Sequence, residues 1–185
     1  MRNILFNKPY GVLSQFTDEG TGHATLKQFI DVPNVYAAGR LDRDSEGLLL
    51  LTDDGGLIKR ITDPRHHIEK TYWAMVEGDP TQDKLERLER GLQLKDYRTL
   101  PAKTRLIPTP NLPARPKPVT PHGPTAWIEI KLREGKKRQV RHMTAAVGLF
   151  TLRLIRVAIG PIQIGGLNPG EWRDLTSHEM KSLRI

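Results

Sequence analysis

The sequence predicts an α+β protein built on a mixed, mostly antiparallel β-sheet. Strand-like and helix-like segments follow one another without the regular strand–helix alternation of a parallel fold. A continuous apolar run at 47–52, bounded by acidic residues and glycines, is typical of a strand buried on both faces. A proline-rich stretch at 108–124 is followed by alternating apolar residues at 125–132, which indicates a loop between two strands of one sheet.

The expected elements are short and lie along the whole chain. Apolar and β-branched residues predict strands at 3–7, 35–38, 47–52, 68–76, 99–107, 125–132 and 151–159. A short helix is expected at 54–61. A second helix begins after Thr81, which suits an N-cap, carries Leu85, Leu88 and Leu92 as one apolar stripe, and ends at Gly91. Between 108 and 124 the closely spaced prolines exclude a helix or a central strand.

Length and composition allow one compact enzyme. The chain has 185 residues, 37% of them hydrophobic, and we expect a single domain over residues 1–185. No apolar run approaches the roughly 20 residues that span a bilayer, and the N-terminal residues lack the apolar stretch of a secretion signal. The absence of cysteine excludes disulfides and thiolate metal sites. We therefore expect a cytoplasmic monomer with no membrane partner.

The charge of the chain favours a polyanionic partner such as nucleic acid or an anionic membrane. The formal net charge is +8 and the isoelectric point is about 9.9, as in many proteins that bind nucleic acid. The stretch 136–156 carries six basic residues and no acid. They are Lys136, Lys137, Arg138, Arg141, Arg153 and Arg156. This cluster predicts a docking face for phosphates.

A polar turn between two apolar strands is the first candidate for chemistry. Residues 39–47 read GRLDRDSEG, which places the carboxylate of Asp42 near the guanidinium groups of Arg40 and Arg43. Nearby positive charges favour the ionised form of an acid. A solvated hairpin turn explains the same charges equally well, because charged turns are common.

A basic helix at 137–147 is the second candidate. Val140, Met143 and Val147 form its apolar stripe. Arg141 lies close to that stripe and is expected to turn inward, where its planar guanidinium can pair with a carboxylate or a phosphate. For Arg138, as for the two lysines before it, an exposed basic face is the preferred interpretation.

Tyr72 and Trp73 lie in the expected strand 68–76 and point to opposite faces of it. One ring should belong to the core, while the other can stack on a base. Both rings being structural is the competing interpretation. The chain has no phosphate-binding glycine loop, no dinucleotide fingerprint and no serine-nucleophile elbow, and its histidines lack metal-ligand spacing. We expect no metal and no cofactor.

Four segments in order along the chain resemble the motifs of the RsuA-like pseudouridine synthases. They are NKPYG at 7–11, GRLDRDSEGLL at 39–49, KTY at 70–72 and EGKKRQVRHM at 134–143. The similarity continues into LRLIR at 152–156 and GEWR at 170–173. Four ordered motifs are far more specific than one.

The resemblance implies a fold and an activity. The fold would be a mixed sheet split by a central cleft, with helices and loops on its flanks. The activity would be the isomerisation of a specific uridine to pseudouridine in the 23S RNA of the large ribosomal subunit, without a cofactor or a small-molecule partner. Ribosomal RNA would then be the partner that the basic charge requires.

The resemblance also implies residue roles. Asp42 falls on the catalytic aspartate, Tyr72 on the tyrosine that stacks against the target base, and Arg141 on the basic residue that pairs with the aspartate. Arg40 falls on an arginine that helps to hold the flipped nucleotide, and Lys8 belongs to a motif that supports the catalytic loop from behind. Together with the basic cluster, the RNA-binding candidates are Arg40, Arg43, Lys136, Lys137, Arg138, Arg153 and Arg156.

One departure from the family concerns RNA docking. Many relatives begin with a small S4-like RNA-binding module, and the first motif at 7–11 leaves no room for one before it. The segment 136–156 and the loop 108–124 are the candidates to replace that surface.

Two other functions remain open from the residues alone. Asp42 and Glu46 could be the paired acids of a uracil N-glycosylase or glycosidase, although that chemistry wants one acid with a raised pKa and the arginines act against it. A non-catalytic ribosomal RNA-binding assembly factor would also suit the basic charge.

Overall fold

The computed structural model describes residues 1–183, so the last two residues of the expected domain lie outside it. The elements are β1 (Asn3–Lys8), a short 3-10 helix (Leu26–Gln28), β2 (Tyr36–Ala37), β3 (Glu46–Thr52), α1 (Gly55–Thr62), a second 3-10 turn (Pro64–His66), β4 (Lys70–Glu77), α2 (Gln82–Arg90), β5 (Lys103–Ile107), β6 (Thr125–Leu132), α3 (Gln139–Ala146), β7 (Phe150–Ile159), β8 (Ile162–Gln163), β9 (Trp172–Asp174) and α4 (Ser177–Leu183). In this range no helix is both long and apolar enough to cross a membrane.

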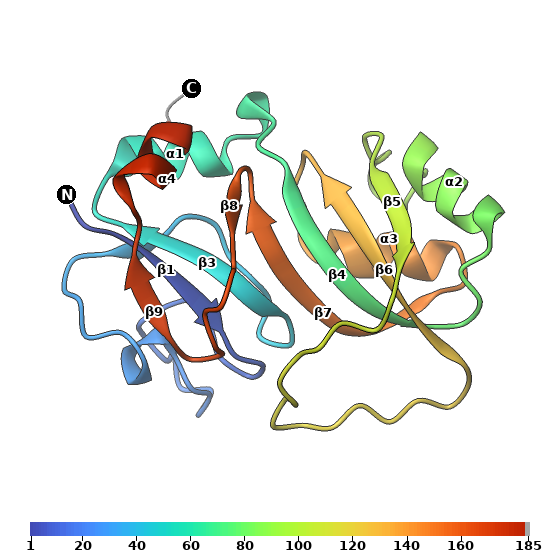
Figure 1. Ribbon diagram of the computed structural model, residues 1–185, viewed down its shortest axis with the longest axis horizontal. Coiled ribbons are helices and arrows are strands. Elements are labelled where there is room, and N and C mark those ends of the chain that lie inside the picture. Colours follow the sequence, from blue (N-terminus) through green and yellow to red (C-terminus); the bar gives the residue numbers. More distant parts are fainter. Residues whose placement is uncertain (184–185) are drawn as a thin grey trace.

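One open sheet runs through the molecule (Figure 1). Its strand order is β5-β6-β4-β7-β3-β1-β9, with β2 beside β3 and β8 beside β7. Among the strands of the described residues, every pairing is antiparallel except that of β3 with β7. The predicted α+β class with a mixed, mostly antiparallel sheet is confirmed.

The parallel junction between β3 and β7 divides the sheet into two halves. These strands pair over only two positions, Glu46 with Ile155 and Gly47 with Arg156, and then diverge (Figure 1). By contrast, β4 follows β6 along its whole length, from Lys70 to Glu77. The expected split of the sheet is therefore located at this short junction.

Strand β3 is the core of the first half. All of its residues are buried, as the continuous apolar run predicts. Leu48 and Leu50 pack in one apolar cluster, which includes Leu57 and Ile61 of α1, while Leu49 and Leu51 pack in another on the opposite face. Because the strand has apolar contacts on both faces, it needs no polar face.

Helix α2 follows its sequence signals closely. The side chain of Thr81 accepts a hydrogen bond from the backbone N–H of Lys84, and Gly91 ends the helix with a φ of 90°. Leu85 and Leu88 are buried against the second half of the sheet, and Leu92 is buried just beyond the helix end. The predicted cap, stripe and stop are all confirmed.

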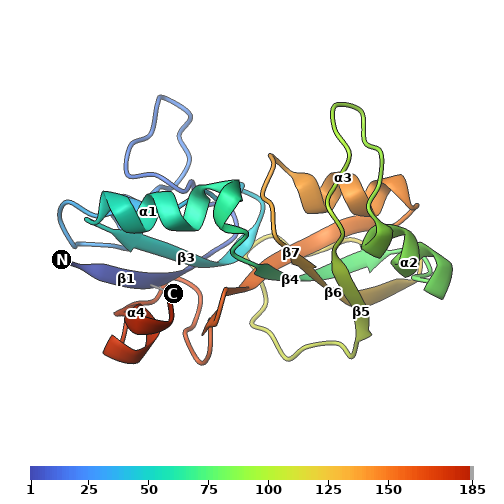
Figure 2. The same cartoon turned by 90° about the horizontal axis from the view of Figure 1, so that it is seen from above.

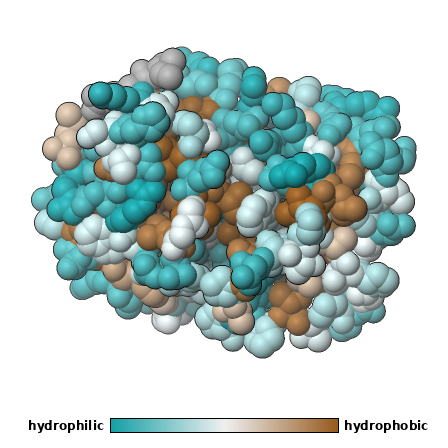
Figure 3. All heavy atoms as spheres, viewed as in Figure 1, coloured by the Kyte–Doolittle hydropathy of each residue, from teal (hydrophilic) through white to brown (hydrophobic). Residues whose placement is uncertain are grey.

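The proline-rich loop 108–124 joins β5 to β6, which pair side by side, so the prediction that it connects two strands of one sheet is confirmed. Leu112 packs against a cluster that contains Trp127 and Ile155, and Arg153 donates a hydrogen bond to the carbonyl of Pro113 at 2.8 Å. Figure 2 shows the loop on the face of the sheet opposite α1 and α3. Figure 3 shows that this side carries apolar side chains near its centre, with hydrophilic ones around them.

Gly47 permits the close approach of β3 to β7. Its φ is 112°, which L side chains rarely adopt. A Cβ atom at this position would lie 2.7 Å from the backbone N of Arg156 and closer still to its carbonyl oxygen. The glycine is therefore a requirement of the junction between the two halves.

We expect Gly47→Ala to lower the free energy of unfolding by about 3 kcal/mol or more, because backbone strain and a clash with an immobile backbone add together. Denaturant unfolding of the purified protein measures this. Gly55→Ala is the matched control, since a Cβ there meets nothing within 4 Å at the start of α1. Equal stability of both variants would show that the junction tolerates a side chain.

Candidate active site

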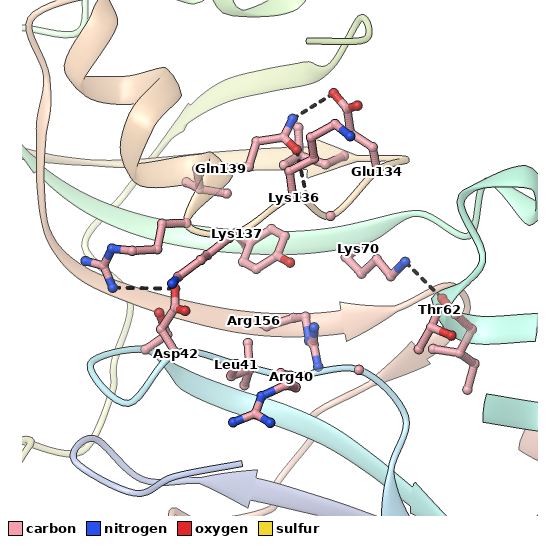
Figure 4. A pocket seen from close by; sticks show the side chains of 18 of the residues that line it. Arg40, Leu41, Asp42, Thr62, Lys70, Glu134, Lys136, Lys137, Gln139 and Arg156 are labelled. Atoms are coloured by element: carbon pink, nitrogen blue, oxygen red, sulfur yellow. Dashed lines mark hydrogen bonds and ion pairs between the residues drawn. The ribbon is translucent and has the colours of Figure 1, made fainter. Parts of the chain in front are cut away.

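A cavity of about 820 Å³ opens beside the junction of the two sheet halves. Its walls come mainly from the loop 38–45, strand β4, the segment 132–140 and β7, and residues between 61 and 68 complete them. Asp42 and Tyr72 both line it, and Figure 4 shows Asp42 on the loop at one side of the cavity and Lys70 on β4 at the other. Residues from four distant parts of the sequence thus face one space.

The loop that carries Asp42 is tied down at its neighbouring residue. Leu41 is buried, and its backbone N–H donates to Ser14 Oγ at 3.0 Å while Ser14 Oγ donates to the Leu41 carbonyl at 2.7 Å. The carbonyl of Asp42 accepts the N–H of Ser45 at 3.0 Å, which closes a turn. The side chain of Asp42 keeps 31% of its surface exposed. A fixed backbone therefore presents a carboxylate that remains accessible.

Lys8 supports the same loop from below. It is fully buried, and its Nζ donates to the carbonyls of Val12 at 2.7 Å, Pro9 at 2.9 Å and Arg43 at 3.4 Å. Burial lowers the pKa of Lys8 to about 7, although the nearby carboxylates, Glu46 first among them, act to raise it. The ammonium group joins β1 to the turn through backbone atoms alone.

Arg138 provides the positive charge closest to Asp42. It precedes α3 in the left-handed conformation, with a φ of 56°. Its guanidinium binds both carboxylate oxygens of Asp44, at 2.9 and 3.0 Å, and lies 3.6 Å from the carboxylate of Asp42. Arg138, expected on an exposed basic face, keeps 37% of its side-chain surface exposed but is engaged by these two acids. The pairing across the cavity holds α3 against the loop.

Arg141 turns inward as predicted but meets a different partner. Its Nη2 donates to the carbonyl of Asp44 at 2.9 Å and lies 3.6 Å from the Asp44 carboxylate. Among the described residues no ion pair joins Arg141 to Asp42, so the expected pairing is corrected. Burial acts to raise the pKa of Asp44, but the hydrogen bonds and charges of Arg138 and Arg141 outweigh it and hold that pKa below its usual range. Arg141 thus fixes the turn next to Asp42.

The basic stretch 136–156 does not form one docking face. Arg153 is 11% exposed in its side chain and binds both carboxylate oxygens of Glu46, at 2.8 and 2.9 Å. Arg156 is buried and donates from Nε to the carbonyl of Leu48 at 2.8 Å. Of the six basic residues of this stretch, only Lys136 and Lys137 are classed as exposed, and both line the cavity. The basic residues are continuous in the sequence but not on the surface, because α3 and β7 direct the side chains of Arg141, Arg153 and Arg156 into the protein.

Exposed cations also stand on the other side of the cavity. Arg40 and Arg43 line it from the loop, and Arg40 donates to the side-chain oxygen of Gln15 at 2.8 Å. Neither forms an ion pair with Asp42 within the described range. Arg138, from a distant segment, therefore takes the place that the sequence assigned to the flanking arginines.

The two aromatic residues of β4 face opposite sides, as expected. Tyr72 is half-buried and lines the cavity beside α3. Trp73 packs on the other face, where its Nε1 donates to Glu129 Oε2 at 3.1 Å. Tyr72 is thus the ring that remains available in the cavity.

Two residues that build the site are not predicted from the sequence. Ser14 lies 27 positions before Leu41, and nothing near it marks a contact with the loop. Asp44 lies in the same motif as Asp42, and it binds both Arg138 and Arg141. The alternation of acids and bases in the 39–47 turn is the one signal that could have identified Asp44. Among the described residues, no group of three acids or histidines is placed to hold a metal ion.

An accessible carboxylate, an aromatic ring and exposed cations around one open cavity define an enzyme that acts on a nucleotide within a nucleic acid. Residues 2–146 match the RNA pseudouridylate synthase family. The chain belongs to this family.

Relatives of the chain cover most of its length. It is 56% identical to the ribosomal large subunit pseudouridine synthase E of Xanthomonas campestris pv. campestris, over 92% of this chain and 93% of that protein. It is 51% identical to the protein of the same name from Vibrio parahaemolyticus, over 93% of this chain and 73% of that protein. A crystal structure of a pseudouridylate synthase superposes with a TM-score of 0.81 at 32% identity, over 98% of this chain and 73% of that one.

The pKa of Lys8 makes stability depend on pH. The unfolded lysine keeps its proton up to its ordinary value of 10.5, whereas the folded one loses it near 7, so the unfolded state binds more protons between these values. Stability should therefore rise with pH in this window. We expect Lys8→Met to remove up to about 1.4 kcal/mol per pH unit of that rise. Denaturant unfolding from pH 7 upward measures it, with Lys95→Met on the surface as control. A slope that survives in Lys8→Met would contradict the assignment.

Proposed function

We propose that this protein converts one specific uridine of the 23S RNA in the large ribosomal subunit to pseudouridine, with Asp42 as the catalytic carboxylate. The observation that carries the proposal is the accessible carboxylate of Asp42 in one cavity with Tyr72, inside a chain of the RNA pseudouridylate synthase family. The names of the two relatives above 50% identity support the large-subunit substrate.

The reaction needs no redox change and no cofactor. The bond from uracil N1 to ribose C1′ breaks, the base turns, and C5 bonds to C1′ while C5 loses its proton and N1 gains one. Asp42 can attack C1′, attack C6 of the ring, or remove the C2′ proton, and each role requires an ionised carboxylate. The guanidinium of Arg138 lies 3.6 Å from this carboxylate.

The target base must leave its stack to reach the cavity. Unstacking costs a few kcal/mol, which contacts to phosphates and to the base have to offset. Tyr72 is the residue that we assign to stacking, at about 1–3 kcal/mol per base. The exposed cations at the cavity mouth are those that we assign to phosphates: Arg40, Arg43, Lys136 and Lys137. We do not assign phosphate binding to Arg153, because its side chain is only 11% exposed. Nor do we assign it to the loop 108–124, which lies on the face of the sheet opposite α1 and α3.

The alternative function as a glycosylase or glycosidase requires Glu46 as a second catalytic acid, and Glu46 is not accessible. Glu46 is 7% exposed in its side chain, and Arg153 occupies both of its oxygens. A general acid needs a proton and access to the leaving group, and this carboxylate has a buried cationic partner instead. A non-catalytic assembly factor would not need an accessible carboxylate in a cavity. The substitution Asp42→Asn distinguishes this alternative from catalysis, because only a catalytic carboxylate is required for turnover.

We further propose that residues 1–185 act as a single catalytic domain and a monomer in the cytoplasm, where ribosomal RNA is the partner. One sheet passes through both halves of the described chain, which supports one folding unit.

Replacing Asp42 by Asn should preserve the fold and the RNA affinity and abolish activity, because the amide can neither attack nor accept a proton. Release of tritium from 5-tritiated uridine in a ribosomal RNA transcript measures turnover. Asp96→Asn, an exposed acid away from the cavity, is the control and should retain full activity. Substantial turnover by Asp42→Asn would remove Asp42 from the mechanism, and free uracil as the product would indicate a glycosylase.

Replacing Lys136 and Lys137 together by Ala should weaken RNA binding and flatten its dependence on salt, because each phosphate contact contributes about 0.7–0.9 to the slope of log K against log salt. Filter binding over a salt series measures the slope. Lys59 and Lys181, also exposed, serve as the control pair when both are changed to Ala. If both pairs leave the slope as it is in the wild type, the phosphates are bound elsewhere.

A further inference from the structure

Arg156 is a buried cation whose hydrogen-bonding capacity is largely unused. It is 5% exposed and lies on β7, and its Nε donates to the carbonyl of Leu48 at 2.8 Å. Within residues 1–183 neither of its terminal nitrogens has a hydrogen-bond partner, and Nη2 is fully enclosed. Leaving the donors of a charged group unpaired in the interior costs more than leaving those of a neutral one.

Among the described residues, no carboxylate pairs with this charge. Of the acids that line the cavity, Asp42 pairs with Arg138, Asp63 pairs with Arg65, and Glu134 accepts hydrogen bonds from Leu100 N–H and the Gln139 amide. Asp44 and Glu46, in the same loop as Asp42, pair with Arg138 and Arg153. Among the described residues Arg156 forms no ion pair at all. The structure therefore keeps a positive charge at this point without an internal counter-ion.

Lys70 adds a second positive charge to the same cavity. Its Nζ donates to the carbonyl of Ile61 at 3.2 Å, and it has no ion pair within the described residues. Burial, together with the charge of Arg156, lowers the pKa of Lys70 to about 8. Arg156 and Lys70 both line the cavity, and neither has an ion pair among the described residues. Two neighbouring cations without a carboxylate partner indicate a binding place for negative charge.

The position of Arg156 indicates a contact with the target base and not with the RNA backbone. Arg156 pairs in register with Tyr72 across β7 and β4, so both side chains rise from neighbouring points of the sheet. Figure 4 shows Arg156 between the loop with Leu41 and Asp42 and the strand with Lys70. The exposed cations that suit phosphates are at the cavity mouth instead. A group at this depth, beside the stacking ring, reaches the edge of a base.

We propose that Arg156, assisted by the charge of Lys70, donates a hydrogen bond to a carbonyl oxygen of the target uracil and stabilises the negative charge that the ring carries during isomerisation. This inference rests on the proposed function and adds a residue to it. Arg156 lines the cavity, and its Nη1 has no hydrogen-bond partner within the described residues.

Every available route puts negative charge on the uracil oxygens. When the N1–C1′ bond breaks with its electron pair left on the ring, the charge is shared by N1 and the two carbonyl oxygens. When Asp42 adds to C6, the pair moves through C5 to O4. The charge disappears when C5 bonds to C1′, C5 loses its proton and N1 is protonated. A donor fixed at a carbonyl oxygen therefore binds the transition state better than the ground state.

The test separates rate from binding. Single-turnover conversion is measured at saturating protein with a large-subunit ribosomal RNA transcript that the wild type modifies, and RNA affinity is measured over a salt series. For Arg156→Gln we expect a fall in rate of about a hundredfold or more, with affinity within about threefold of wild type and an unchanged salt slope. Arg87→Gln on the outer surface of α2 is the control and should match the wild type.

Lys70→Met keeps the test decisive if Arg156→Gln does not fold, because Lys70 is less buried. Its rate should fall at least about tenfold at unchanged affinity. An unchanged rate in both variants, or weaker binding with a flatter salt slope and a normal rate, would overturn the inference, the second result in favour of a phosphate contact. Absence of pseudouridine with the wild-type protein on every ribosomal RNA would instead refute the proposed function, and the inference with it.

Discussion

The bidentate pairing of Arg138 with Asp44 is the interaction on which the site depends. It joins the start of α3, in one half of the sheet, to the loop at the start of β3, in the other half. The same guanidinium lies 3.6 Å from Asp42, so the contact that closes the site also places a positive charge beside its carboxylate. Arg141 strengthens the arrangement by binding the carbonyl of Asp44. Asp42 itself has the longer 3.6 Å ion pair with Arg138, while the hydrogen bonds of Arg138 go to Asp44 in the same turn.

The loop is secured from two directions, and this explains how an exposed carboxylate can be rigid. Lys8 binds backbone carbonyls below the loop, and Ser14 binds both backbone groups of Leu41. These supports use main-chain atoms, so they leave the side chain of Asp42 free for substrate. Rigidity of this kind is favourable for catalysis because a carboxylate that is already in place loses little freedom when it reacts.

The elements of the fold could largely be predicted from local patterns. The buried run of β3, the cap and stripe of α2 and the alternating residues of β6 each appear where their sequence signals lie. Those signals are local because period, capping and burial on both faces depend on neighbouring residues. The motifs in turn identified the family, and with it Asp42 and Tyr72 as candidates. The direction of basic side chains was not predictable in this way, since Arg138 and Arg153 find their carboxylates 94 and 107 positions away.

The sequence by itself determined the class of fold, the family and the place of the acidic turn, because each is encoded in residues close together along the chain. Tertiary structure alone decided which cations face solvent and which carboxylate each arginine binds. It also decided that Arg156 pairs with no carboxylate among residues 1–183. The reason is physical: an ion pair forms wherever folding brings two charges within reach, and the short β3–β7 junction brings together segments that are distant in the chain.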